Sequence, residues 1–192
     1  MTDAYYKGLL ERARQGPLSR QEADTVTSEL QRRAPQISRV TLLHILSQMH
    51  DLTYLKLVEQ FLQSKEDPML TRLALKILCS EWGLTQHYVD QVLAFMRPVP
   101  WDEAGYIRQI AISIAGEHLR RHRSAPLLQE LVRIFAEAEP QELILEDTYF
   151  ALARAVGHEW SEIPSAARPV DIATQADPAV IAMAKQRLLH GG

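Results

Sequence analysis

The densest group of residues that could do chemistry is the stretch HLRRHR at residues 118–123. His118 and His122 are four residues apart, so on a helix they project from one face, and Glu117 lies beside them. Two histidines leave a tetrahedral zinc ion short of protein ligands, and the arginines of the same turn repel a dication. We therefore expect no metal here. The cations suit the carbonyl end of a helix, and a basic patch for phosphate or an acidic partner is the alternative.

Glu146 and Asp147 are adjacent carboxylates, the residue type that general acid–base catalysis uses. Neighbours on a helix point about 100° apart, so this pair does not converge on one substrate. Both belong to an acidic tract over residues 137–162, in which seven acids face one arginine, Arg154. Helix starts favour acids and explain part of the tract; the functional interpretation is a docking face for a basic protein. The acids are Glu137, Glu139, Glu142, Glu146, Asp147, Glu159 and Glu162.

Motifs of common enzymes are absent from the sequence. It holds no glycine-rich phosphate loop, no Gly-x-Ser-x-Gly, no Cys-x-x-Cys and no His-Glu-x-x-His. The single cysteine, Cys79, lies in an apolar stretch, which favours a small buried core residue over a nucleophile. We expect no catalytic residues and no cofactor.

A helix over residues 66–82 sets the pattern for the rest of the chain. Asp67 is the expected N-cap, and Pro68 takes the first helical position, where a missing N–H costs nothing. Apolar residues then recur at spacings of three and four, which predicts one buried stripe. The residues expected to face away from this stripe are Thr71, Arg72 and Lys76.

Further helices are expected in pairs. Three pairs are predicted: 38–49 with 52–63, 66–82 with 85–96, and a helix after Asp102 with one from Ala125. A last helix then runs from 143 to 156 and is stopped by Gly157. Two lead-in helices precede them, at 4–15 and from Ser19, where Ser19 and Glu22 have the spacing of a capping box, and Asp177 with Pro178 starts a terminal helix. A small residue recurs at Ala74, Ala111, Ala151 and Ala184, at intervals of 37, 40 and 33 residues. Alanine lets neighbouring helices approach closely, so this period predicts a helical repeat.

Three segments, DPMLTRLALKIL, YIRQIAISIAG and YFALARAVG, resemble the first helices of HEAT and HEAT-like (armadillo-type) repeats. The resemblance covers roughly residues 36–190, although the aspartate and arginine usual at the turn and second helix of that family are not regularly placed. It implies an all-α, right-handed α-α superhelix (solenoid) of about four HEAT-like helical hairpins with capping helices at both ends. A generic helical bundle is the alternative.

The expected domain organisation is a single α-solenoid domain over 1–192. It comprises N-terminal capping helices at 1–35, HEAT-like hairpins at 36–157, and an irregular segment with a C-terminal capping helix at 158–192. The net charge of −3 does not indicate a nucleic-acid binder. Neither a signal peptide nor an apolar run long enough for a membrane span is visible. We expect a soluble, cytoplasmic protein that is a monomer on its own.

The working surface expected of such a solenoid is its concave face, lined by the second helices. Mixed polar groups on a rigid scaffold suit a protein surface. The residues concerned are Tyr54, Glu59, Gln63, His87, Asp90, Gln91, Arg97, Glu130, Arg133 and Glu137, with Glu146 and Asp147 of the acidic tract. Trp101 and Trp160, in predicted loops, are either binding anchors or tucked under hairpin ends.

The resemblance implies a non-catalytic scaffold that binds a protein. A small, slightly acidic solenoid resembles immunity proteins of polymorphic toxin systems, which mask a toxin domain; acids would meet a basic toxin surface and steer association. The first alternative is a HEAT-like DNA glycosylase or other nucleic-acid-binding protein, which the equal numbers of acids and bases on the second helices disfavour. The second is a lyase or regulatory subunit of a larger enzyme.

Overall fold

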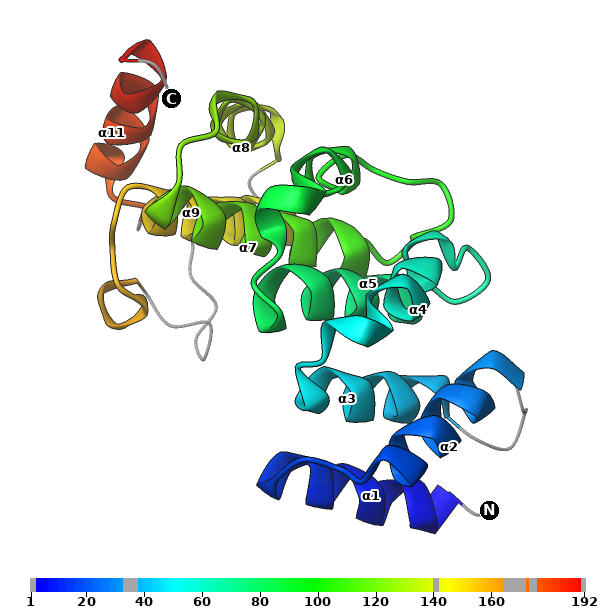
Figure 1. Cartoon of the computed structure of the whole chain (residues 1–192). Coiled ribbons are helices and arrows are strands. Elements are labelled where there is room, and N and C mark those ends of the chain that lie inside the picture. Colours follow the sequence, from blue (N-terminus) through cyan, green and yellow to red (C-terminus); the bar gives the residue numbers. More distant parts are fainter. Residues whose placement is uncertain (1–2, 33–37, 140–141, 164–171, 173–175, 191–192) are drawn as a thin grey trace. The chain divides into compact units, whose positions relative to one another are not determined.

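The computed structural model describes residues 3–32, 38–139, 142–163, 172 and 176–190. Within these ranges every regular element is a helix or a short helical turn, and no strand is present (Figure 1). The prediction of an all-α chain is therefore confirmed. The helices gather in two compact units, Met1–Leu84 and Thr85–Gly192.

The first unit is built around α3, which packs against α1, α2 and α5. In chain order it contains α1 (Asp3–Gln15), α2 (Arg20–Arg32), α3 (Arg39–Met49), the 3-10 turn η1 (Leu52–Tyr54), α4 (Leu55–Glu59), the 3-10 turn η2 (Gln60–Gln63), α5 (Pro68–Lys76) and the π-helical turn η3 (Ile77–Glu81). Leu43 and Leu46 of α3 and Leu70 of α5 are fully buried in its core. The predicted helix over 52–63 is thus three short pieces.

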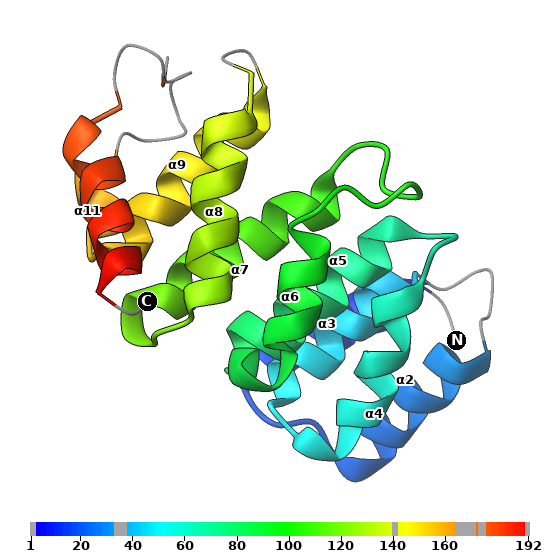
Figure 2. The same ribbon diagram turned by 90° about the horizontal axis from the view of Figure 1, so that it is seen from above.

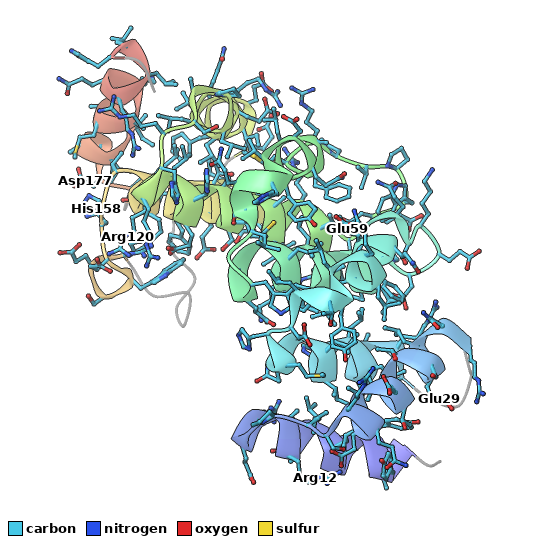
Figure 3. The ribbon with its side chains drawn as sticks, in the orientation of Figure 1. Arg12, Glu29, Glu59, Arg120, His158 and Asp177 are labelled. Carbon is cyan, nitrogen blue, oxygen red and sulfur yellow. The ribbon has the colours of Figure 1, made fainter. Side chains whose placement is uncertain are left out.

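The start of α2 shows the predicted capping box. The Glu22 carboxylate accepts hydrogen bonds from the Ser19 N–H at 2.9 Å and the Ser19 hydroxyl at 2.8 Å, while the Glu22 N–H donates to the Ser19 hydroxyl at 3.3 Å. Arg12 of α1, labelled in Figure 3, adds an ion pair to Glu22 at 2.5 Å. These contacts fix α2 against α1.

The segment 66–82 departs from its prediction in three ways. The Asp67 side chain makes no capping hydrogen bond, and the helix changes to π-helical geometry at Ile77. Thr71, expected on the polar face, is fully buried: its hydroxyl donates to the Phe61 carbonyl at 2.9 Å and accepts from the Ser64 N–H at 3.2 Å. The Ser64 N–H also donates to the Phe61 carbonyl at 3.2 Å, so the hydroxyl adds a second partner to each of these backbone groups, and its own hydrogen bonds make burial of the polar side chain favourable.

The second unit has α7 and α9 packed side by side, with α6, α8 and α11 against them (Figure 2). Its elements are the 3-10 turn η4 (Thr85–Tyr88), α6 (Val89–Phe95), α7 (Tyr106–Arg121), α8 (Ala125–Glu137), α9 (Leu143–Ala155), the 3-10 turn η5 (Trp160–Glu162) and α11 (Pro178–Leu189). The Asp102 carboxylate caps α7 by accepting from the N–H groups of Tyr106 at 3.1 Å and Ile107 at 2.8 Å. Asp177 caps α11 as predicted, accepting from the Ala179 N–H at 2.8 Å.

The closest helix crossing joins α7 to α9. A Cβ atom placed on Gly116 would lie 2.6 Å from Cα of Ala151, so only glycine fits at this crossing. The four periodic alanines, Ala74, Ala111, Ala151 and Ala184, are all buried. Small residues therefore occupy helix contacts, as their spacing predicts. Cys79 is buried as well, and no described helix has the length and apolar character that a membrane span requires.

Candidate functional site

The residues predicted for the concave face fall in both units. In the first, Tyr54 and Glu59 are half-buried and Gln63 is exposed, with Glu59 paired to Lys56 at 2.8 Å. In the second, His87 and Asp90 are exposed and Gln91 is half-buried. Each unit therefore contributes its own group of polar side chains.

Four of the predicted residues form one ion-pair network between α8 and the end of α6. Glu130 is buried, and its carboxylate accepts from Arg133 Nη2 at 2.6 Å, from Arg133 Nε at 3.1 Å and from Arg97 Nε at 3.2 Å. Arg133 also pairs with Glu137. The hydrogen bonds from Arg133, with help from Arg97, hold the pKa of Glu130 below its usual value. The Glu130 carboxylate is thus occupied by arginines of this chain.

Arg154, the one base of the acidic tract, is 3% exposed at the C-terminal end of α9. Its guanidinium forms a two-pronged pair with Glu117 of α7, Nε to Oε1 at 2.5 Å and Nη2 to Oε2 at 3.1 Å. Nη1 donates to the His158 carbonyl at 2.5 Å and to Glu159 at 3.2 Å. Burial is the largest single influence on the pKa of Glu117 and raises it, but the hydrogen bonds and charge of Arg154, together with Arg120 and Trp160, outweigh burial, so the pKa is lowered.

The loop after α9 closes over this arginine. Arg120 pairs with Glu159 (Figure 3), and the Trp160 ring lies over the Arg154 guanidinium at 5.1 Å from its centroid while remaining 54% exposed. Glu162 accepts from the Glu159 N–H at 2.7 Å. We call the cluster of Glu117, Arg120, Arg154, Glu159 and Trp160 the paired end of α9.

The N-terminal end of α9 carries carboxylates without such partners. Among the described residues, Glu139, Glu142 and Glu146 form no ion pair within 4 Å. Between them lies Leu143, which is 70% exposed and occupies the first position of the helix. We call the group Glu139, Glu142, Leu143, Glu146 and Asp147 the acidic end.

Asp147 shows that negative charge is poorly compensated there. Its Oδ2 atom is buried and has no hydrogen-bond partner among the described residues. Burial, followed by the charge of Glu146, raises the pKa of Asp147 to about 6. The charges of Glu146 and Asp147 therefore repel each other.

At the C-terminal end of α7, His118 and His122 stack with ring centroids 4.7 Å apart and planes at 21°. His118 is 6% exposed, and its Nε2 has no hydrogen-bond partner among the described residues. Burial and then the charge of His122 lower the pKa of His118. Stacked rings do not converge on one ion, and the Arg187 Nη2 atom donates to the His122 carbonyl at 3.1 Å.

Sequence reasoning missed Arg154, Leu143 and Arg187 as residues of interest. Arg154 and Glu117 are 37 positions apart, which equals the interval between Ala74 and Ala111. A repeat of that length places such positions on adjacent helices, so the spacing was a usable signal. For Leu143 the signal was its place between acids at a helix start.

Comparison of the chain with protein-family models, with curated proteins and with solved structures gave no match.

Proposed function

We propose that this chain is a non-catalytic protein-binding scaffold whose acidic end docks on a basic partner protein and masks it. The observation that carries the proposal is the exposed Leu143 among carboxylates that lack partners in the described structure. An apolar anchor inside a charged rim is the usual composition of a protein-binding patch.

Charge gives this patch a preference for basic surfaces. The acids of the paired end are already neutralised by Arg120 and Arg154, so they add little attraction. Glu139, Glu142 and Glu146 form no ion pair within 4 Å among the described residues, although the charge of Glu142 acts on Arg108, and their negative charge raises the association rate with a positively charged partner. Occlusion of a basic toxin, in the manner of an immunity protein, is the mechanism that this charge distribution fits best.

The same proposal includes the finer architecture. Within the second unit, α7 and α9 pack on each other and α8 packs on both, while α11 packs on α8 and α9. We propose that the chain is a right-handed HEAT-like superhelix, a single solenoid domain located in the cytoplasm; what supports the layered part of this proposal is the succession of helix contacts. Rigid helical scaffolds of this type suit steric masking because they lose little conformational entropy on binding.

The first experiment is a pull-down of the tagged chain from its native organism with mass spectrometry, followed by affinity measurements on the purified partner. The test variant is Glu139→Lys with Glu142→Lys and Glu146→Lys. The matched control is Glu11→Lys with Asp24→Lys and Glu66→Lys, three exposed acids of the first unit that receive the same charge change. We expect the test variant to bind at least about 100-fold more weakly, chiefly through slower association, and the control to change binding less than about threefold.

The dependence of partner affinity on salt concentration is the second test of docking through the acidic end. Affinity for the partner should fall as ionic strength rises, since exposed charges are screened. A salt-insensitive complex, or equal losses in the test and control variants, would refute docking through the acidic end. Duplex DNA that co-purifies and dissociates steeply with salt would favour the nucleic-acid alternative instead.

A further inference from the structure

The second unit carries a basic surface where α7, α9 and α11 end. Arg121, His122 and Arg123 are exposed there. The Arg187 guanidinium of α11 donates to the carbonyls of His122 and of Ala155, so it joins the C-terminal ends of three helices. The nearest acids in sequence, Glu117 and Glu159, are already paired with arginines of the paired end.

An open, mainly apolar depression of about 350 Å³ lies beside these cations. Its lining residues are Val156, Met183, Gln186, Arg187 and His190. Met183 is 45% exposed, so its thioether side chain is available for contact. We call Arg121, Arg123 and this depression the basic end.

The acidic and basic ends lie at opposite ends of α8. This helix begins at Ala125, just after Arg123, and finishes at Glu137, just before Glu139 (Figure 2). Thirteen helical residues span about 20 Å. One end of the unit presents an exposed leucine among acids, and the other presents a mainly apolar depression beside bases, so the two are opposite in charge and each has an apolar part.

We propose that the basic end is a docking site for the acidic end of a second copy of this chain. Leu143 of one copy enters the depression against Val156 and Met183 of the other, while Glu142 and Glu146 face Arg121 and Arg123. The contact is head-to-tail, so each copy keeps one free end and further copies can add. This contact does not depend on the partner protein proposed above. Under this proposal the chain is a monomer only at low protein concentration or at high salt, and not under all conditions as expected from the sequence.

Sedimentation velocity of the full chain tests this contact, with protein from micromolar to millimolar concentration at low and high salt. Two variants each remove one end: Glu142→Lys with Glu146→Lys, and Arg121→Glu with Arg123→Glu. A control, Arg20→Glu with Lys65→Glu, makes the charge change of the second variant on exposed residues of the first unit. We expect wild type and control to self-associate at low salt, and each end variant to do so at least about tenfold more weakly.

Mixing the two end variants gives the decisive result. One retains the basic end and the other the acidic end, and the two reversed ends are complementary in charge as well, so an equimolar mixture should regain the self-association that each variant has lost. The quadruple variant, which has the wild-type net charge and both ends reversed, should regain self-association. A mixture of folded variants that stays monomeric, or end variants that associate like wild type, would overturn the proposal. The Arg121→Glu, Arg123→Glu variant keeps the acidic end, so its capture of the basic partner tests the proposed function separately.

Discussion

The two ends of α9 carry the same kind of residue in opposite states. At the paired end, Glu117 and Glu159 are held by Arg154 and Arg120, and a tryptophan covers the guanidinium. At the acidic end, Asp147 is half-buried with its pKa raised to about 6, and its neighbours have no ion pair among the described residues. At the paired end the carboxylates stabilise the fold. At the acidic end Asp147 lowers stability, and the exposed carboxylates beside it are available for binding. The summed charge of residues 137–162 does not reveal this difference.

The largest expected effect comes from breaking the paired end. Arg154→Ala removes the buried partner of Glu117 and Glu159 and should lower the free energy of unfolding by about 3 kcal/mol, since the packing of a buried side chain and its charge-assisted hydrogen bonds are lost, while both carboxylates stay partly exposed. Urea unfolding followed by circular dichroism measures this loss. The control Arg123→Ala, at an exposed position, should change stability by less than about 0.5 kcal/mol. If Arg154→Ala and Arg123→Ala lowered the free energy of unfolding equally, the paired end would stabilise the fold no more than an exposed arginine does.

Gly116→Ala tests the crossing that brings Glu117 to Arg154. The added methyl group would lie 2.6 Å from Cα of Ala151, so the helices must separate, and we expect a loss of about 2 kcal/mol. Gly8→Ala in α1 is the control, because nothing lies within 4 Å of an added Cβ atom there. Alanine at that helical position should stabilise the chain by roughly 0.5 to 1 kcal/mol. Thermal unfolding of the pair of variants gives the comparison, and a stable Gly116→Ala chain would contradict the tight crossing.

Asp147→Asn should stabilise the chain at neutral pH by about 1 kcal/mol, a value reduced for partial exposure to solvent. The folded-state pKa of Asp147, about 6, exceeds its ordinary value of 3.8. The native state therefore binds more protons between these values, and wild-type stability falls as pH rises from about 4 to about 6. The difference in the free energy of unfolding between Asp147→Asn and wild type should reach its full value above pH 6 and vanish below pH 4. Unfolding free energies measured across this range check the sign, and an advantage that grows toward acid would contradict it.

The smallest effect is a change in titration rather than in stability. Glu146→Gln removes the second cause of the raised pKa of Asp147 and leaves burial, the first cause, in place. We expect the pKa to fall by a fraction of a unit and to stay above 3.8. Carboxyl carbon NMR titration of Asp147 measures the shift. An unchanged pKa would show that the two acids do not interact.

Sequence periodicity predicted most of the helices, because apolar spacing and caps such as Ser19 and Asp177 act locally. It failed where long-range partners decide the outcome. Thr71 turned inward because its hydroxyl binds the Phe61 carbonyl ten positions earlier. Glu130 is buried with its carboxylate bonded to Arg133, three positions away, and also to Arg97, 33 positions away, and only the first of these partners is local in the sequence.

Long-range partners also decide which acids of the expected docking face form ion pairs. Acids at 137–162 are visible in the sequence, but which of them are neutralised depends on Arg120 and Arg154 meeting Glu159 and Glu117 across two helices. Exposure of Leu143 likewise follows from the residue at which α9 begins. Such details depend on the positions of helix ends, which apolar spacing defines only loosely.

Trp160 gives this chain an internal optical reporter. Trp82 and Trp101 are half-buried, whereas the Trp160 indole is 54% exposed and lies on the Arg154 guanidinium. Quenching of its fluorescence by acrylamide therefore follows whether the loop stays closed over that arginine, without any label. Opening of one end of α9 can in this way be timed separately from unfolding of the whole chain.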